Sequence, residues 1–384
     1  MKQNTMGALK VPTFTLAPSL ESLRQEVRAF LRDQLAGVAR SHLAQSWQGV
    51  DPEFSRSLGA RGWIGMTLPR RYGGAGKGPL ERYVVTEELL AAGAPVRAHW
   101  IGDRQTGPML LRYGSEAQRL QILPGIARGE LFICAGMSEP NAGSDLAAVR
   151  CRAEKSADGW IVNGSKIWTS LAHIAHYMVA LLRTDPDVTK KHAGLSQFLI
   201  DMRTPGITVR PIRDMRGHEH FNEVFFDNVQ LPPDAIVGGE GEGWKQIGHE
   251  LGFERSGPER YLSSIQLMIE MLNAASAEDS RHAIELGRLI AETATLRQMS
   301  LGVAGMLSRE EDPNVSAAIV KDLGATLEQK IPEVAHDLFY LEPQAADSPL
   351  AQVMDPTLRA TPSTSIRGGA REILRGIIAR GLEQ

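Results

Sequence analysis

Apolar residues at helical spacing predict that the chain opens with helices. Glu87 and Glu88 lie in one such stretch, with apolar positions on either side of them. An earlier helix is predicted to begin at Pro18 and Ser19, because six apolar residues follow one helical face: Leu20, Leu23, Val27, Phe30, Leu31 and Leu35. The glycine-rich segment 73–79 between them lacks the Gly-Lys-Ser/Thr of a Walker loop, so it predicts a surface turn rather than a phosphate loop.

The middle of the chain changes to the rhythm of β-strands. Residues 160–168 predict two short strands joined at Asn163-Gly164, because Asn-Gly is a strong hairpin signal. Further strands are predicted at 178–182, 196–200, 207–209 and 223–226. Several short strands at this spacing indicate a small sandwich or barrel.

The last third of the chain returns to helical spacing. One apolar stripe comprises Ile319, Val320, Leu323 and Leu327, and a second comprises Ile373, Leu374, Ile377 and Ile378. The order helix, strand, helix predicts an α+β protein of three domains. We expect a helical domain at 1–135, a β domain at 136–243 and a helical domain at 244–384.

Composition narrows the class of protein. The chain has 384 residues, of which 42% are hydrophobic and 23% charged, which is typical of a globular protein with more than one core. A net charge of −3 argues against a strongly basic nucleic-acid binder. With two cysteines, Cys134 and Cys151, we expect neither a disulfide framework nor a cysteine-rich metal site, and we predict no metal-binding residues. The sequence shows no signal peptide and no apolar run of about 18 residues, so we expect no membrane span and a cytoplasmic location.

Two short segments carry candidate chemistry. Residues 137–145 read Met-Ser-Glu-Pro-Asn-Ala-Gly-Ser-Asp. Either their free amides approach an anionic cofactor, or Ser144 or Asp145 caps an ordinary turn. Residues 166–170 read Lys-Ile-Trp-Thr-Ser. Either Trp168 covers a flat ring whose edge the hydroxyls bind, or it lies in the core. Taken singly, each segment favours the structural interpretation.

Together with other segments in the same order, these two resemble the acyl-CoA dehydrogenase family. The resemblance covers most of the chain and includes residues 63–65, 72–74, 113–114, 123–124, 164–170, 204–206, 221–226 and 239–244. It implies an N-terminal helical domain, a middle β-barrel and a C-terminal four-helix bundle. It also implies an enzyme that removes two hydrogens from an acyl-CoA thioester and gives a trans-2-enoyl-CoA.

The resemblance further implies FAD, bound between the middle domain and the C-terminal helices. Six residues fall at positions that contact this cofactor in the family: Met137, Ser138, Ser144, Trp168, Thr169 and Ser170. Ser138 would reach the pyrimidine end of the flavin ring, and Ser144 would meet the pyrophosphate. Trp168 would lie against the isoalloxazine, with the Thr169–Ser170 segment near its N5 atom.

The family reaction needs a carboxylate that takes the α-proton, and members place it at one of two positions. One position corresponds to Gly368 here, which has no side chain, and the other corresponds to Glu254. We therefore predict that Glu254 is the base and that Gly368 donates its backbone N–H to the thioester oxygen. The alternative for Glu254 is a helix-face carboxylate paired with an arginine. Arg255 matches an arginine near the substrate, or forms a buried ion pair, and Glu372 is expected to be solvated.

The family pattern breaks where homomeric members contact the FAD of a neighbouring subunit. Residues 277–284 lack the Phe-Gly of an Arg-x-x-Phe-Gly segment, although Arg281 is a candidate for its arginine, and 336–343 lack a Gln-x-x-Gly-Gly pattern. Two such chains would leave an anionic cofactor poorly compensated. In this the chain is similar to heteromeric members that shorten steroid side chains. That similarity implies an α2β2 heterotetramer with a second acyl-CoA dehydrogenase-like subunit, a bulky acyl-CoA substrate, and an electron-transfer flavoprotein or similar acceptor.

Two alternative functions stay open at this point. In the first, the chain is a non-catalytic or half-site partner subunit, and activity would survive Glu254→Gln. In the second, it is an acyl-CoA oxidase or flavin monooxygenase on the same fold, and the reduced flavin would react rapidly with oxygen.

Overall fold

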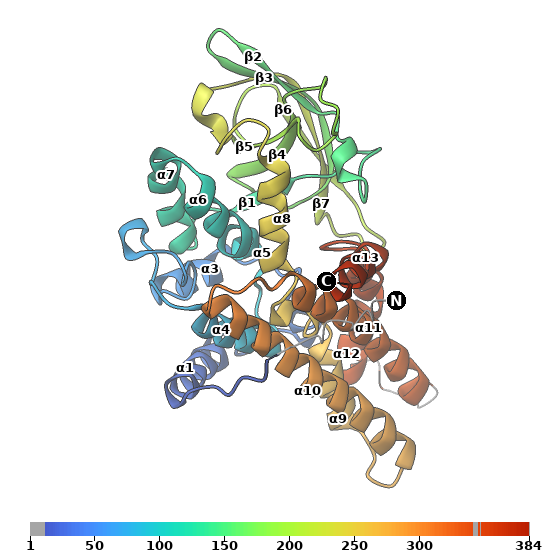
Figure 1. Cartoon of the computed structure of the whole chain (residues 1–384). Coiled ribbons are helices and arrows are strands. Elements are labelled where there is room, and N and C mark those ends of the chain that lie inside the picture. The colour runs from blue at the N-terminus through green and yellow to red at the C-terminus, as the bar shows by residue number, and fades with distance from the viewer. Residues whose placement is uncertain (1–11, 341–344, 346, 384) are drawn as a thin grey trace, which may run out of the picture. The chain divides into compact units, whose positions relative to one another are not determined.

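The computed structural model describes residues 12–340, 345 and 347–383, and the side chains of residues 251–254 lie outside that description. The chain divides by its contacts into two compact units. One comprises residues 51–76 and 98–251, and the other comprises 1–50, 77–97 and 252–384. The succession of helices, strands and helices along the chain confirms the predicted α+β class (Figure 1). The domain boundaries at 135 and 243 stay a prediction.

The first unit contains a mixed sheet of eight strands (Figure 1). They are β1 (Ile133–Gly136), β2 (Arg152–Ser156), β3 (Gly159–Ser170), β4 (Tyr177–Arg183), β5 (Leu195–Asp201), β6 (Ile207–Ile212), β7 (Phe221–Leu231) and β8 (Ile236–Val237). Their order is β6-β7-β3-β2-β4-β5-β8, and β1 pairs with β4 in parallel. The strands predicted at 178–182, 196–200, 207–209 and 223–226 are confirmed as parts of β4, β5, β6 and β7.

The hairpin predicted within residues 160–168 is wrong, because β3 is one continuous strand. The chain turns earlier, at residues 157–158, between β2 and β3. Gly164 has a φ of +136°, and a Cβ there would lie 2.8 Å from the Cα of Cys151. Glycine is therefore required for close approach of two chain segments, and the Asn-Gly pair does not make a turn. The opposing strand bulges at this point, with Asn228 at a φ of +50°.

The core of this unit is apolar and contains both cysteines. Trp160 meets Phe198 edge to face at 5.2 Å, and Met178 and Val224 are fully buried around them. Cys134 and Cys151 are free thiols in this core. Burial raises the pKa of Cys151 to about 12, so its thiol stays protonated and unreactive.

Helices complete the sheet-containing unit. They include α3 (Pro52–Ala60), η2 (Gly102–Thr106), α6 (Gly107–Tyr113) and α7 (Glu116–Ala127). The unit also contains α5 (Arg97–Ile101) except its first residue and α8 (Gly243–Glu254) except its last three residues. The predicted glycine-rich turn follows the short helix η1 (Arg70–Tyr72). Gly73 ends that helix with a φ of +83°, as a turn of this kind requires.

The second unit is helical in its described part. Its helices are α1 (Pro18–Gln34), α2 (Arg40–Leu43), α4 (Pro79–Ala91), η5 (Pro258–Arg260), α9 (Ile265–Ala274), α10 (Ser280–Ser308), α11 (Asn314–Phe339), α12 (Pro349–Ala360), η6 (Thr361–Ser365) and α13 (Arg371–Leu382). The predicted start at Pro18 is confirmed. Helix α1 packs on α4, and α11 packs on both α10 and α13. None of the described helices combines the length and the apolar stretch that a membrane span requires.

Candidate functional site

Trp168 lies in an irregular part of β3 and is exposed. The pairing of β3 with β7 shifts by one residue between Lys166 and Thr169, and Trp168 takes a φ of +58°. A left-handed conformation at a bulky residue costs about 1–2 kcal/mol, and such strain gathers at functional sites. The Trp168 side chain is 57% exposed and stands edge-on to Phe221, with the ring centroids 6.0 Å apart. Placement of this tryptophan in the core is therefore wrong.

Thr169 adds an unpaired hydroxyl beside the exposed ring. The residue is 1% exposed, and its Oγ1 atom has no hydrogen-bond partner among the described residues. Its carbonyl accepts a hydrogen bond from Asn222 Nδ2 at 3.0 Å, which fixes the backbone. An unsatisfied buried hydroxyl costs about 1–3 kcal/mol. A ligand with a polar edge would remove that cost.

Lys166 and Glu139 hold the loop of residues 137–145 against β3. The Nζ atom of Lys166 lies 2.8 Å from Glu139 Oε1 and donates to the carbonyl of Met137 at 3.1 Å. Lys166 is fully buried, and this desolvation lowers its pKa. The carboxylate of Glu139 also accepts the backbone N–H of Arg150 at 2.6 Å and of Cys151 at 2.9 Å. This glutamate therefore joins the loop to the backbone just before β2.

The two candidate segments lie side by side. The N–H of Ile167 donates to the carbonyl of Ser138 at 2.9 Å, so Met137 and Ser138 are next to the strand that carries Trp168. Ser144 lies farther along the same loop and is exposed. Asp145 pairs with Lys191 at 3.6 Å on the surface. The structure thus gathers the predicted flavin-contacting residues on one loop and one strand.

Glu254 is the last residue of α8, and its side chain lies outside the described residues. Arg255 follows it and is only 6% exposed. The Nε atom of Arg255 donates to the carbonyl of Gly368 at 3.2 Å, across a separation of 113 residues. Gly368 and Gly369 have φ values of +71° and +104°, which favour glycine. The structure therefore brings the neighbour of Glu254 to the other predicted base position.

Glu372 and Arg281 are the two remaining residues that the sequence singled out. Glu372 is exposed on α13, as expected. Arg281 pairs with Asp279 at the start of α10, with Nη2 and Oδ2 2.6 Å apart. This hydrogen bond holds the pKa of Asp279 at about 2. Arg281 thus already has a counter-charge, and part of the segment 336–343 lies outside the described residues.

Asp214, His218 and His220 form a cluster of potential metal ligands among the described residues, with donor atoms within 4.8 Å of one another. The carboxylate of Asp214 is already engaged. Its Oδ1 accepts two backbone N–H groups, and its Oδ2 accepts the guanidinium of Arg216 at 3.2 Å. A cation would have to displace this arginine, so we assign the cluster no metal role.

The roles of Lys166 and Glu139 were missed by sequence reasoning, although both lie in the candidate segments. Alternation along β3 places Lys166 on the same face as the buried Val162. A charged side chain at an inward position needs a partner, and this is the signal from which the pair could have been found.

Two family models match the sequence: the acyl-CoA dehydrogenase N-terminal domain at residues 17–130 and the acyl-CoA dehydrogenase middle domain at 134–229. Acyl-CoA dehydrogenase IpdE1 of Mycobacterium tuberculosis is 32% identical, covering 94% of this chain and 96% of its own. Acyl-CoA dehydrogenase FadE29 of the same organism is 30% identical, covering 95% and 96%. The chain belongs to the acyl-CoA dehydrogenase family, and the predicted family and enzyme class are confirmed.

Solved structures agree with the predicted fold. The Tcur3481-Tcur3483 steroid ACAD, where ACAD stands for acyl-CoA dehydrogenase, superposes with a TM-score of 0.85 at 26% identity, covering 98% of this chain and 99% of that one. The ChsE4-ChsE5 complex of Mycobacterium tuberculosis gives a TM-score of 0.82 at 27% identity, covering 96% and 98%. The predicted fold class is confirmed.

Proposed function

We propose that this chain is the base-carrying subunit of an FAD-dependent acyl-CoA dehydrogenase. The observation that carries the proposal is the hydrogen bond from Arg255 to the Gly368 carbonyl. It joins the residue after Glu254 to the position where other members carry the base. A carboxylate at residue 254 therefore supplies from one segment what residue 368 lacks.

The residues of the loop and of β3 fit the flavin ring of FAD. An exposed tryptophan ring offers a flat surface, and the unpaired hydroxyl of Thr169 offers a hydrogen bond to a polar edge. Met137, Ser138 and Ser170 would complete the contacts with the ring, and Ser144 would meet the pyrophosphate. Bound FAD would supply the two-electron acceptor for the β-hydrogen.

Glu254 takes the proton from the α-carbon of the acyl group. The α C–H bond breaks, the proton passes to the carboxylate oxygen, and the bonding electrons form the new double bond as the β-hydrogen leaves with its electron pair. Charge that develops on the thioester oxygen is stabilised by the N–H of Gly368. Arg255, the next residue in the chain, is only 6% exposed, so bulk water has little access to its side chain.

We also infer an unlike partner subunit, a bulky acyl-CoA substrate and an electron-transfer flavoprotein as acceptor. Two similar structures are named as pairs of unlike chains, and one of them is named a steroid enzyme. The pairing of Arg281 with Asp279 supports this inference, because the arginine proposed for the homomeric pattern already has a counter-charge. The substrate would be a steroid side-chain acyl-CoA.

The test compares Glu254→Gln with Glu372→Gln in the complex co-expressed with its partner. We expect Glu254→Gln to slow both dehydrogenation and exchange of the α-hydrogen in D2O by roughly 10²–10⁴-fold, the usual contribution of a general base. Flavin content should stay unchanged. Glu372→Gln should leave both rates as they are, because that side chain is exposed. Activity that survives Glu254→Gln would favour a non-catalytic subunit.

A further inference from the structure

We propose that Glu328 and Arg367 are positioning residues, which hold the N–H of Gly368 in the orientation that meets the thioester oxygen. This inference rests on the proposed function, because it concerns the same donor. Arg367 directly precedes Gly368 in the chain, and Glu328 lies on α11.

The turn that presents this donor is flexible by composition. Gly368 and Gly369 are consecutive glycines with positive φ values, and glycine loses more conformational freedom on folding than any other residue. Such a turn keeps one orientation only if its flanking residues are fixed. Arg255 fixes the carbonyl of Gly368, but the N–H of Gly368 belongs to the peptide unit that begins with Arg367.

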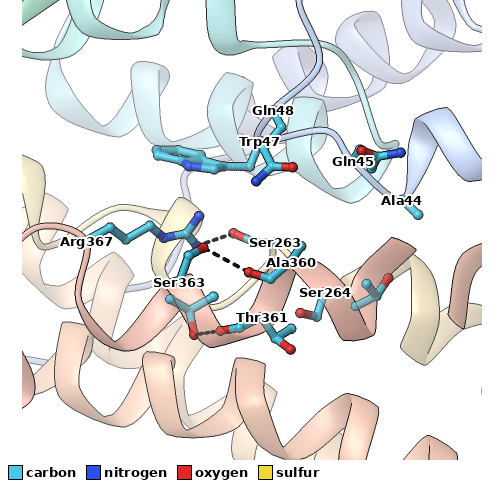
Figure 2. Close-up of a pocket in the computed structure, with 12 residues that line it drawn as sticks. Ala44, Gln45, Trp47, Gln48, Ser263, Ser264, Ala360, Thr361, Ser363 and Arg367 are labelled. Atoms are coloured by element: carbon cyan, nitrogen blue, oxygen red, sulfur yellow. Dashed lines mark hydrogen bonds between the residues drawn. The ribbon is translucent and has the colours of Figure 1, made fainter. Parts of the chain in front are cut away.

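The side chain of Arg367 is anchored at three points. Its Nη2 atom donates to Ser263 Oγ at 2.7 Å and to Glu328 Oε2 at 2.9 Å. Its guanidinium also lies over the ring of Trp47, 4.7 Å from the centroid (Figure 2). The Arg367 side chain is 19% exposed, and charge-assisted hydrogen bonds together with a cation–π contact are among the stronger kinds of side-chain anchor. The peptide unit between Arg367 and Gly368 is thereby held on its N-terminal side.

Glu328 connects this anchor to the segment that follows Glu254. Its side chain is 1% exposed, and its Oε1 atom accepts the N–H of Ser263 at 2.8 Å. A single buried carboxylate on α11 thus binds both Ser263 and Arg367. A Cβ on Gly324 would lie 2.1 Å from the carbonyl oxygen of Arg260, so α11 also packs closely on η5. Helix α11 therefore holds the turn at Gly368 in place relative to η5 and Ser263.

Loss of this anchor should affect the reaction more than the binding of substrate. The negative charge on the thioester oxygen develops on the way to the transition state, so a misdirected N–H removes stabilisation there. A shift of about 1 Å in a catalytic group can cost on the order of 100-fold in rate. The effect should therefore appear in kcat and in α-hydrogen exchange.

The test uses Glu328→Gln, Arg367→Met and Arg367→Lys in the co-expressed complex. We expect Glu328→Gln and Arg367→Met to lower kcat and α-hydrogen exchange together by roughly 10–100-fold, with little change in KM or flavin content. Arg367→Lys should have a higher kcat than Arg367→Met, because lysine keeps the positive charge but lacks the planar guanidinium and its several N–H donors. If Arg367→Met does not fold, Arg367→Lys and Glu328→Gln carry the test.

Glu270→Gln is the matched control. Glu270 is 4% exposed and pairs with Arg40, which makes it a buried carboxylate of the same helical unit away from the turn. It should lower the melting temperature without changing kcat. The inference is overturned if all these variants lower the melting temperature alike and leave kcat intact while Glu254→Gln abolishes it. A wild-type complex without α-hydrogen exchange would overturn the proposed function, and this inference with it.

Discussion

A buried ion pair between Lys166 and Glu139 holds the loop that carries the proposed flavin contacts. Lys166→Met would leave the Glu139 carboxylate without its counter-charge, next to two backbone donors. Removal of one partner of a buried pair is strongly destabilising. We expect a loss of about 3 kcal/mol in the free energy of unfolding and a lower flavin content, measured by denaturant titration and absorbance.

Lys191→Met is the control for this change, because Lys191 pairs with the same loop through Asp145 but both side chains are exposed. It should change the free energy of unfolding by less than about 0.5 kcal/mol. Equal effects of the two substitutions would show that the buried pair does not fix the loop.

Substitution of Thr169 should stabilise the apoprotein but weaken the binding of FAD. Thr169→Val removes a buried hydroxyl that has no partner among the described residues. The apoprotein should therefore gain about 1 kcal/mol of stability, whereas the dissociation constant for FAD should rise roughly tenfold. Thermal unfolding of the apoprotein and flavin titration measure the two effects. Thr208→Val, at an exposed position on β6, should change neither quantity.

At the scale of single elements, the sequence predicted the helices α1, α4, α11 and α13 and the strands β4 to β7, because their signals are local. The start of α1 follows from the proline in its first turn, and the runs of β4 and β5 follow from the spacing of apolar residues. The hairpin prediction at Asn163-Gly164 was wrong because the glycine is needed for close approach to Cys151. No local pattern in the sequence reveals that contact. The exposure of Trp168 and the contact of Arg255 with Gly368 likewise depend on pairing between distant segments.

Two glycines on different elements should respond to alanine with opposite signs. At Gly164 on β3 a Cβ would meet backbone at 2.8 Å, and the φ of +136° disfavours any side chain. Gly164→Ala should therefore cost at least about 2 kcal/mol. At Gly248 on α8 a Cβ would meet nothing within 4 Å. Gly248→Ala should add about 0.5–1 kcal/mol by favouring the helix. Urea unfolding of both variants measures the change in the free energy of unfolding. If both variants lose a similar amount of stability, this account of Gly164 is wrong.

For the whole molecule, the two compact units are each assembled from separate stretches of chain. The helical unit joins residues 1–50 and 77–97 to residues 252–384. The spacing of apolar residues shows where helices give way to strands along the chain, but it does not show which distant stretches pack together. The ion pair of Glu87 on α4 with Arg297 on α10, at 2.7 Å, is one such long-range contact. The sequence therefore predicted the order of elements but not this grouping.

The last prediction concerns the assembly. If an unlike subunit supplies the cofactor contacts that this chain lacks, the chain purified alone should hold little FAD. Co-expression with the product of an adjacent acyl-CoA dehydrogenase-like gene should give an α2β2 complex with one FAD for each unlike pair. Native mass spectrometry and flavin absorbance measure both quantities.

The Glu254→Gln chain should assemble and bind FAD as well as the wild type, because the proposed base is not a flavin contact. A stable homo-oligomer of this chain, with one FAD per chain and full activity, would rule out the need for a partner. Glu254 would then remain the proposed base, but of a homomeric enzyme, since the contact between Arg255 and Gly368 lies within one chain.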